Sequence, residues 1–65
     1  MGNADENMLL TSEELAHYVK VKRRTVETWR TRNKGPAYIR IEGGYVRYRL
    51  ADVENWLNNS YRAGA

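Results

Sequence analysis

The residues best suited to chemistry are the basic side chains of one short stretch, VKRRTVETWRTRN at residues 21–33. This stretch holds five of the chain's eleven Lys and Arg residues. Guanidinium and ammonium groups at this density suit the phosphates of a nucleic acid, and Arg, Thr and Glu also hydrogen-bond to the edges of bases. Nucleic-acid binding is therefore the first chemistry that the sequence indicates.

The distribution of charge along the chain favours the same chemistry. Residues 1–19 carry four acidic and no basic side chains, residues 20–49 carry ten basic against two acidic, and residues 50–65 carry one basic against two acidic. The net charges are thus −4, +8 and −1, which sum to the +3 of the whole chain. A central block of +8 is typical of a polyanion binder, but a solvated basic surface without a partner has the same composition.

Residues for catalysis or metal binding form no comparable set. The chain has no Cys, and its single histidine, His17, has no second His with which to form a metal site. The adjacent acids Glu13–Glu14 complement a helix start, and neither Ser12 nor Ser60 has the partners of a nucleophilic triad. Gly43–Gly44 lacks the Lys and Ser/Thr continuation of a phosphate-binding loop. We therefore predict that the protein is not an enzyme and binds no cofactor or metal.

The length of 65 residues permits one domain, which we expect at residues 9–60 between flexible tails at 1–8 and 61–65. The chain has no Phe, five Tyr and two Trp, so a few large aromatic side chains must fill much of its core. The longest apolar run is Met8–Leu10, which is far too short to span a bilayer, and no secretory signal precedes it. We expect a cytoplasmic protein without a membrane partner.

Two helices should position the basic stretch. Thr11–Glu14 forms a capping box, in which the Thr hydroxyl and the Glu carboxylate each accept from the other residue's amide, so a helix of about two turns begins there. A second helix should run over residues 23 to about 32 and end before Gly35–Pro36. Within it, Val26 and Trp29 lie about 60° apart and define a buried face, whereas Arg24 points almost the opposite way. We therefore predict that Trp29 is a core residue rather than one that stacks on nucleic-acid bases.

A β-hairpin and a third helix should follow. Residues 38–42 and 45–49 alternate with period two around Gly43–Gly44, which suits a tight two-residue turn. One face of the ribbon must pack on the helices, and we expect its inward residues to be Ile39, Ile41, Val46 and Tyr48, with Arg40, Arg47 and Arg49 facing outward. A helix over residues 51–59 should close the core with Val53, Trp56 and Leu57.

This order of elements fits a helix-turn-helix, whose second helix enters the DNA major groove. Leu15, Ala16, Val19, Val21, Val26 and Trp29 occupy the small or apolar positions of that motif. A pair of amphipathic helices without DNA function would imitate some of these six positions.

The segments LLTSEELAHYVKVKRRTVETWR, GPAYIRIEGGYVRYR and DVENWL, over residues 9–57, resemble the excisionase and AlpA-type group of small MerR-like winged helix-turn-helix proteins. The resemblance implies an α+β, mainly helical fold in the order α-α-β-β-α. It also implies specific binding of double-stranded DNA through the second helix and the hairpin, or wing. Many such proteins act in the excision of integrated phages and mobile elements, and others regulate transcription.

Two residues depart from the family pattern. Lys20 stands in the turn where the family usually has Gly, and a left-handed backbone there costs roughly 1 kcal/mol or more, so the sequence leaves the geometry of the turn open. Lys22 stands where the family often has a capping Ser. It forfeits a cap worth about 1 kcal/mol and adds a cation beside the DNA.

The motif geometry assigns roles to individual side chains. Candidates for base edges are Arg23, Arg24, Glu27 and Thr28, and candidates for phosphate contacts are Lys22, Thr25 and Arg30. On the wing, Arg47 is the strongest candidate for the adjacent minor groove or backbone, with Tyr45 and Arg40 as further contacts.

The leading hypothesis is a sequence-specific DNA-binding protein resembling an excisionase, whose partners are an integrase or another copy of itself, through cooperative binding to adjacent sites or dimerisation. A transcriptional regulator of the AlpA type and the DNA-recognition domain of a terminase small subunit are alternatives that the sequence does not separate. A third hypothesis, from another class, is a basic protein-interaction module whose partner is an acidic protein rather than DNA.

Overall fold

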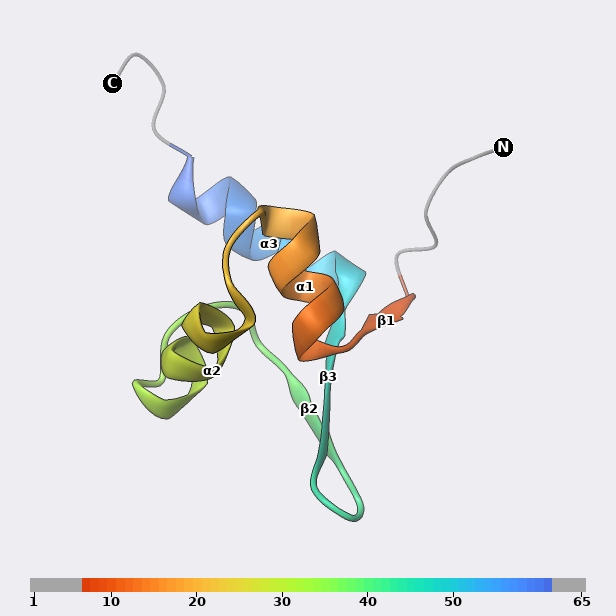
Figure 1. Ribbon diagram of the computed structural model, residues 1–65. Coiled ribbons are helices and arrows are strands. Elements are labelled where there is room, and N and C mark those ends of the chain that lie inside the picture. The colour runs from red at the N-terminus through yellow and green to blue at the C-terminus, as the bar shows by residue number, and fades with distance from the viewer. Residues whose placement is uncertain (1–6, 62–65) are drawn as a thin grey trace.

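The computed structural model describes residues 7–61, which form three helices and a small antiparallel sheet (Figure 1). In chain order, the elements are β1 (Leu9–Leu10), α1 (Ser12–Val19), α2 (Arg23–Thr31), β2 (Ile39–Ile41), β3 (Tyr45–Arg49) and α3 (Leu50–Ser60). The hairpin of β2 and β3 extends away from the helices (Figure 1). This is the predicted α+β winged helix-turn-helix. Most of the tails predicted at 1–8 and 61–65, namely residues 1–6 and 62–65, lies outside the described part of the chain.

Helix α1 begins at the predicted capping box. The Glu14 amide donates to Thr11 Oγ1 at 3.0 Å, and the Thr11 amide donates to Glu14 Oε1 at 2.8 Å. The helix ends at Lys20, which adopts the left-handed conformation with φ 63° and ψ 47°. The Val21 amide then donates to the Ala16 carbonyl at 2.9 Å and closes the turn. Lys20 therefore makes the turn that glycine usually makes, at a strain of about 1 kcal/mol.

Helix α2 ends as the Gly-Pro sequence predicts. Asn33 and Gly35 follow the helix with φ of 59° and 86°, values that turn the chain away from the helix axis. A Cβ atom at Gly35 would lie 3.1 Å from the Trp29 side chain, so this position needs glycine both for its backbone and for its space.

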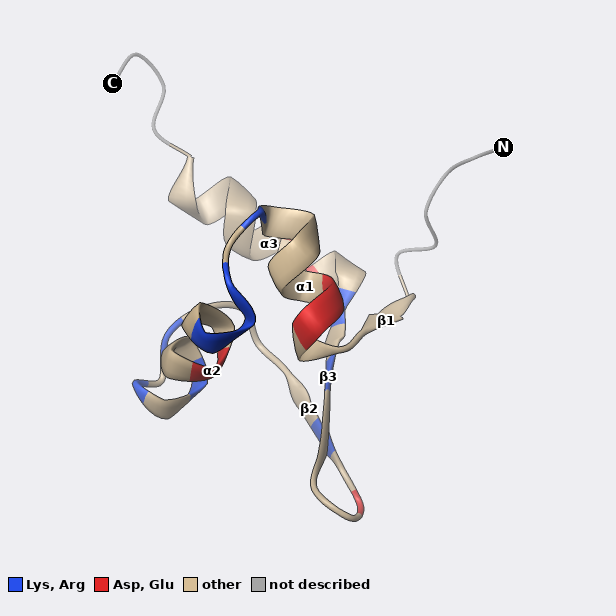
Figure 2. Ribbon diagram, in the orientation of Figure 1, with Lys and Arg blue, Asp and Glu red and all other residues tan. Residues whose placement is uncertain are grey.

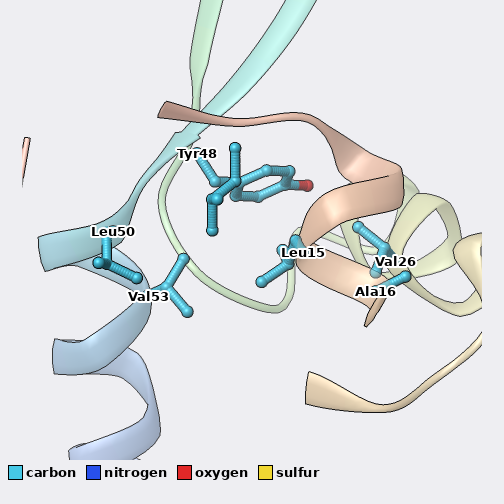
Figure 3. Close-up of a cluster of buried hydrophobic side chains, with 7 residues drawn as sticks. Leu15, Ala16, Val26, Tyr48, Leu50 and Val53 are labelled. Carbon is cyan, nitrogen blue, oxygen red and sulfur yellow. The ribbon is translucent and has the colours of Figure 1, made fainter. Parts of the chain in front are cut away.

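The core lies between α1, α2, β3 and the start of α3. Its buried members are Leu10, Leu15, Ala16, Val26, Tyr48, Leu50 and Val53. The Tyr48 ring extends from β3 toward the start of α1 (Figure 3). Trp29 packs on the edge of this cluster, with its ring centroid 5.0 Å from that of Trp56, which confirms its prediction as a core residue. Leu50 was not predicted, because α3 begins one residue earlier than expected.

The sheet contains a strand that the sequence analysis missed. Its order is β1-β3-β2, and the two-residue strand β1 pairs with β3 so that Leu10 lies opposite Tyr48. The Leu50 amide donates to the Met8 carbonyl at 2.8 Å just beyond this pairing. A strand of two residues is too short to show a period in the sequence.

The register of the hairpin corrects the predicted inward face. Ile41 pairs with Tyr45, so the loop has three residues, 42–44, rather than two. Because paired residues share a face, Ile39 and Ile41 lie on the face of Tyr45 and Arg47. Their prediction as inward residues was wrong, and Ile41 is 40% exposed.

The opposite face holds the residues that meet the core. Val46 and Tyr48 lie on it as predicted, and both join the core cluster. Arg40, which pairs with Val46, shares this face instead of the face of Arg47 and Arg49. The prediction that Arg40 shares a face of the hairpin with Arg47 and Arg49 was therefore wrong. Its side chain nevertheless stays exposed, with the guanidinium 5.8 Å from the Tyr38 ring centroid.

Candidate nucleic-acid interface

Helix α2 is anchored on one face and exposes basic side chains on the other. Val26 is fully buried against the core, and Trp29 packs at its edge. Of the predicted DNA-binding residues here, those that are exposed are Lys22, Arg23, Arg24 and Thr28, and those that are half-buried are Thr25, Glu27 and Arg30. Lys and Arg residues lie in the turn before α2 and at the start of the helix (Figure 2). Lys22 makes no side-chain cap, as expected from its type.

A cleft of about 370 Å³ lies between α2, the start of α1 and the tip of the hairpin. Arg23, Glu27 and Arg30 line it from α2, residues 44–47 line it from the wing, and residues 11–13 line it from α1. The structure thus brings five predicted site residues to one cleft: Arg23, Glu27, Arg30, Tyr45 and Arg47. The other five do not line it: Lys22, Arg24, Thr25, Thr28 and Arg40.

Two of the predicted base-reading residues bind each other. Arg23 Nε donates to Glu27 Oε2 at 3.0 Å, one helical turn away. The Arg23 side chain is 63% exposed and the Glu27 side chain 44%, so solvent screens the pair and it contributes little to stability. Its effect is geometric: the Glu27 carboxylate occupies the Nε edge of Arg23 and leaves both terminal nitrogens as donors.

Arg30 contacts three side chains from other parts of the chain. Its Nη1 donates to Ser12 Oγ at 2.8 Å and to the Tyr48 hydroxyl at 3.0 Å. Its guanidinium also lies 5.9 Å from the Tyr38 ring centroid. One side chain therefore joins α2 to the start of α1 and to β3.

The wing presents one arginine beside an exposed aromatic ring. Arg47 Nη1 donates to the Val46 carbonyl at 2.8 Å, and its guanidinium lies 5.8 Å from the Tyr45 ring centroid. Tyr45 is 62% exposed. Gly43 and Gly44 form the tip with φ of 92° and 89°, a conformation that residues with a side chain rarely adopt.

Sequence reasoning missed the contribution of the start of α1. Thr11, Ser12 and Glu13 line the cleft, and Ser12 also holds Arg30. The local pattern already explained these three residues as parts of a helix start, so nothing in the sequence indicated that they line a cleft. The Tyr48 hydroxyl was missed because the pattern identified only its ring, as a core residue. Both contacts depend on tertiary packing between residues that are 18 positions apart.

Within residues 7–61, no three side chains of His, Cys, Asp or Glu gather where they could hold a metal ion. No helix in this part of the chain has the length and apolar character needed to cross a bilayer.

Comparison with known protein families gives a match. The family model described as a helix-turn-helix domain matches residues 9–61, which is most of the chain. This family includes excisionase-like and AlpA-like small DNA-binding proteins. A search of curated proteins found no significant match.

Proposed function

The chain belongs to the helix-turn-helix domain family, and from this premise we propose that it binds specific sites on double-stranded DNA in the cytoplasm, as an excisionase-type protein. One observation carries the DNA-binding part of the proposal. Helix α2 is fixed to the body by the buried Val26, while Arg23 and Arg24 project from it into solvent. A helix held in this way suits insertion into a major groove.

In this proposal, the side chains of α2 divide into two groups. Arg23, Arg24 and Thr28 meet base edges, and Glu27 acts beside them. Lys22, Thr25 and Arg30 contact phosphates, which fix the register of the protein on the duplex without reading its sequence.

The wing makes a second contact beside α2. Arg47 and Tyr45 lie at the cleft with Arg23, so the hairpin tip can reach the adjacent minor groove or backbone when α2 is in the major groove. Arg40 does not line the cleft and serves as an outer phosphate contact in this scheme.

The biological role that we propose is architectural. The protein would occupy sites near a recombination end of a phage or mobile element and orient an integrase there. A single module of this size buries too little surface for tight solitary binding, so we expect a second copy to bind an adjacent site. A neighbouring integrase gene would favour this role. A neighbouring large-terminase gene would favour DNA packaging. The absence of both genes would favour a transcriptional regulator.

Selection of binding sites from random duplexes, followed by mobility-shift titration, tests the proposal. We expect an enriched motif, and a scrambled competitor should bind much more weakly than the selected site. Equal affinity for both would contradict specific binding.

If Arg24 clamps a guanine, Arg24→Ala should cost about 1–3 kcal/mol of binding free energy on the selected site. Replacing both Arg23 and Arg24 with Ala should abolish DNA retention, whereas a module that binds acidic proteins would show no change.

A further inference from the structure

The hydrogen bonds of Arg30 lie between the two parts of the candidate interface. Arg30 belongs to α2, and its Nη1 reaches both Ser12 of α1 and Tyr48 of β3. Within residues 7–61, no other side chain of α2 hydrogen-bonds to α1 or to the sheet. Arg30 is half-buried, so solvent competes only partly for these contacts.

The Tyr48 hydroxyl, which accepts one of these hydrogen bonds, is held in place by the burial of its ring. The Tyr48 residue is only 1% exposed, and its ring is packed among core side chains (Figure 3). A hydroxyl on such a ring has few positions available and needs a polar partner, which Arg30 supplies. Tyr48 directly follows Arg47 along β3, so a bond that fixes Tyr48 relative to α2 also fixes the base of the wing.

The hydrogen bond to Ser12 attaches Arg30 to a second element, helix α1. Ser12 is the first residue of α1, and its hydroxyl takes no part in the capping box, which Thr11 and Glu14 form. The Ser12 hydroxyl is therefore available to accept from Arg30. Two acceptors on separate elements hold one nitrogen of a planar, rigid group.

We propose that Arg30 is a positioning residue that sets the spacing and angle between α2 and the wing. Through the bonds to Ser12 and Tyr48, it holds Arg23 on α2 and Arg47 on β3 across one cleft, so that both can engage a single duplex. This inference rests on the proposed DNA-binding function. It adds a role for Arg30 beyond the phosphate contact proposed above.

The test uses variants that remove the acceptors and keep the arginine. Ser12→Ala and Tyr48→Phe each delete one hydroxyl, leave the capping box and the buried ring in place, and preserve the charge of Arg30. Residual dipolar couplings of the free protein then report the orientation of β2 and β3 relative to α2. We expect the double variant to change this orientation or to increase its variation, and unchanged couplings would overturn the proposal.

A double-mutant cycle on the selected DNA site supplies the second readout. In the wild-type background, Arg47→Ala should weaken binding by about tenfold. In the background lacking both hydroxyls, the same change should weaken it by no more than about twofold, because the wing no longer meets the duplex together with α2. A loss of about tenfold in both backgrounds would overturn the proposal. Arg32→Ala, which removes an exposed charge just after α2, is the control and should be additive with loss of the hydroxyls.

The two readouts separate this inference from the function on which it rests. Equal binding of selected and scrambled duplexes would defeat the proposed function, while the couplings of the free protein would still test the role of Arg30. Specific binding with unchanged couplings would defeat only the positioning role. If Tyr48→Phe unfolds the chain, Ser12→Ala alone carries both measurements, since Ser12 lies outside the core.

Discussion

At the residue scale, the pairing of Arg23 with Glu27 changes the role expected for the acid. Glu27 was a candidate for base edges, where a carboxylate can accept from a cytosine amine, but its Oε2 already accepts from Arg23 Nε. Glu27 can therefore act by orienting Arg23, whose two terminal nitrogens remain able to meet the O6 and N7 atoms of guanine.

Glu27→Gln tests which role applies. Removing an acid near the phosphates should raise affinity for unrelated duplexes about two- to fivefold, while discrimination at one base pair falls. Stability should change by no more than about 0.5 kcal/mol, because the pair is exposed. Competition titrations measure both binding effects. If Glu27 acts through Arg23, the discrimination effect disappears in an Arg23→Ala background, and its persistence there would support direct reading by Glu27.

The left-handed backbone of Lys20 should have a measurable effect on the stability of the protein. Its φ of 63° is a conformation that a side chain disfavours and glycine adopts readily. We expect Lys20→Gly to raise the free energy of unfolding by about 1 kcal/mol, measured by urea denaturation. Lys20→Ala is the matched control and should give no such gain, since alanine keeps the Cβ atom. Equal effects of the two changes would show that the backbone of this turn is not strained.

At the element scale, α1 and α3 are joined by one hydrogen bond between residues that lie 36 positions apart. The Tyr18 hydroxyl donates to Glu54 Oε2. This hydrogen bond, together with desolvation and repulsion by the same carboxylate, raises the pKa of Tyr18 above 10.0. A raised pKa means that the folded state favours the neutral phenol. The stabilisation is therefore complete below about pH 10 and disappears as pH rises through the folded-state pKa.

Tyr18→Phe should remove this dependence. At pH 8, the variant should be less stable than the wild type by less than about 1 kcal/mol, because the site is exposed, and the difference should shrink toward pH 11. Urea denaturation at the two pH values measures it. Tyr61→Phe, at a ring that is 76% exposed, is the control and should leave the difference between the two pH values unchanged. A deficit of Tyr18→Phe that grows with pH would contradict the assignment.

The hairpin shows how far an element can be predicted from its own sequence. Alternation identified both strands, and the glycines identified the turn. The pattern did not distinguish a two-residue loop from the observed three-residue loop, and one residue of register moves Ile39 and Ile41 to the other face. The position of those side chains follows from the hydrogen bonds of the turn, such as that from the Gly44 amide to the Ile41 carbonyl at 2.9 Å.

At the scale of the whole molecule, the same division between local and distant information recurs. The capping box of α1, the buried face of α2 and the end of that helix were predictable, since each depends on residues within a few positions of one another. Strand β1 was not, because its pairing of Leu9 with Arg49 joins residues 40 positions apart. Motif geometry had proposed five of the cleft residues, Arg23, Glu27, Arg30, Tyr45 and Arg47, as DNA contacts, and that role stays a prediction. The contribution of Ser12 depends on how α1 packs against the other elements.

The charge of the whole molecule leads to the last prediction. A chain with +8 on residues 20–49 that neutralises about six phosphates should show a slope of log affinity against log salt of about −5. Arg47→Ala should make the slope about 1 less steep if the wing contacts a phosphate, whereas Glu54→Gln on α3 should leave it unchanged. Fluorescence anisotropy of a labelled duplex at several salt concentrations measures all three slopes. A slope near zero for the wild type would mean that the basic residues do not meet DNA phosphates, and it would favour the protein-interaction hypothesis.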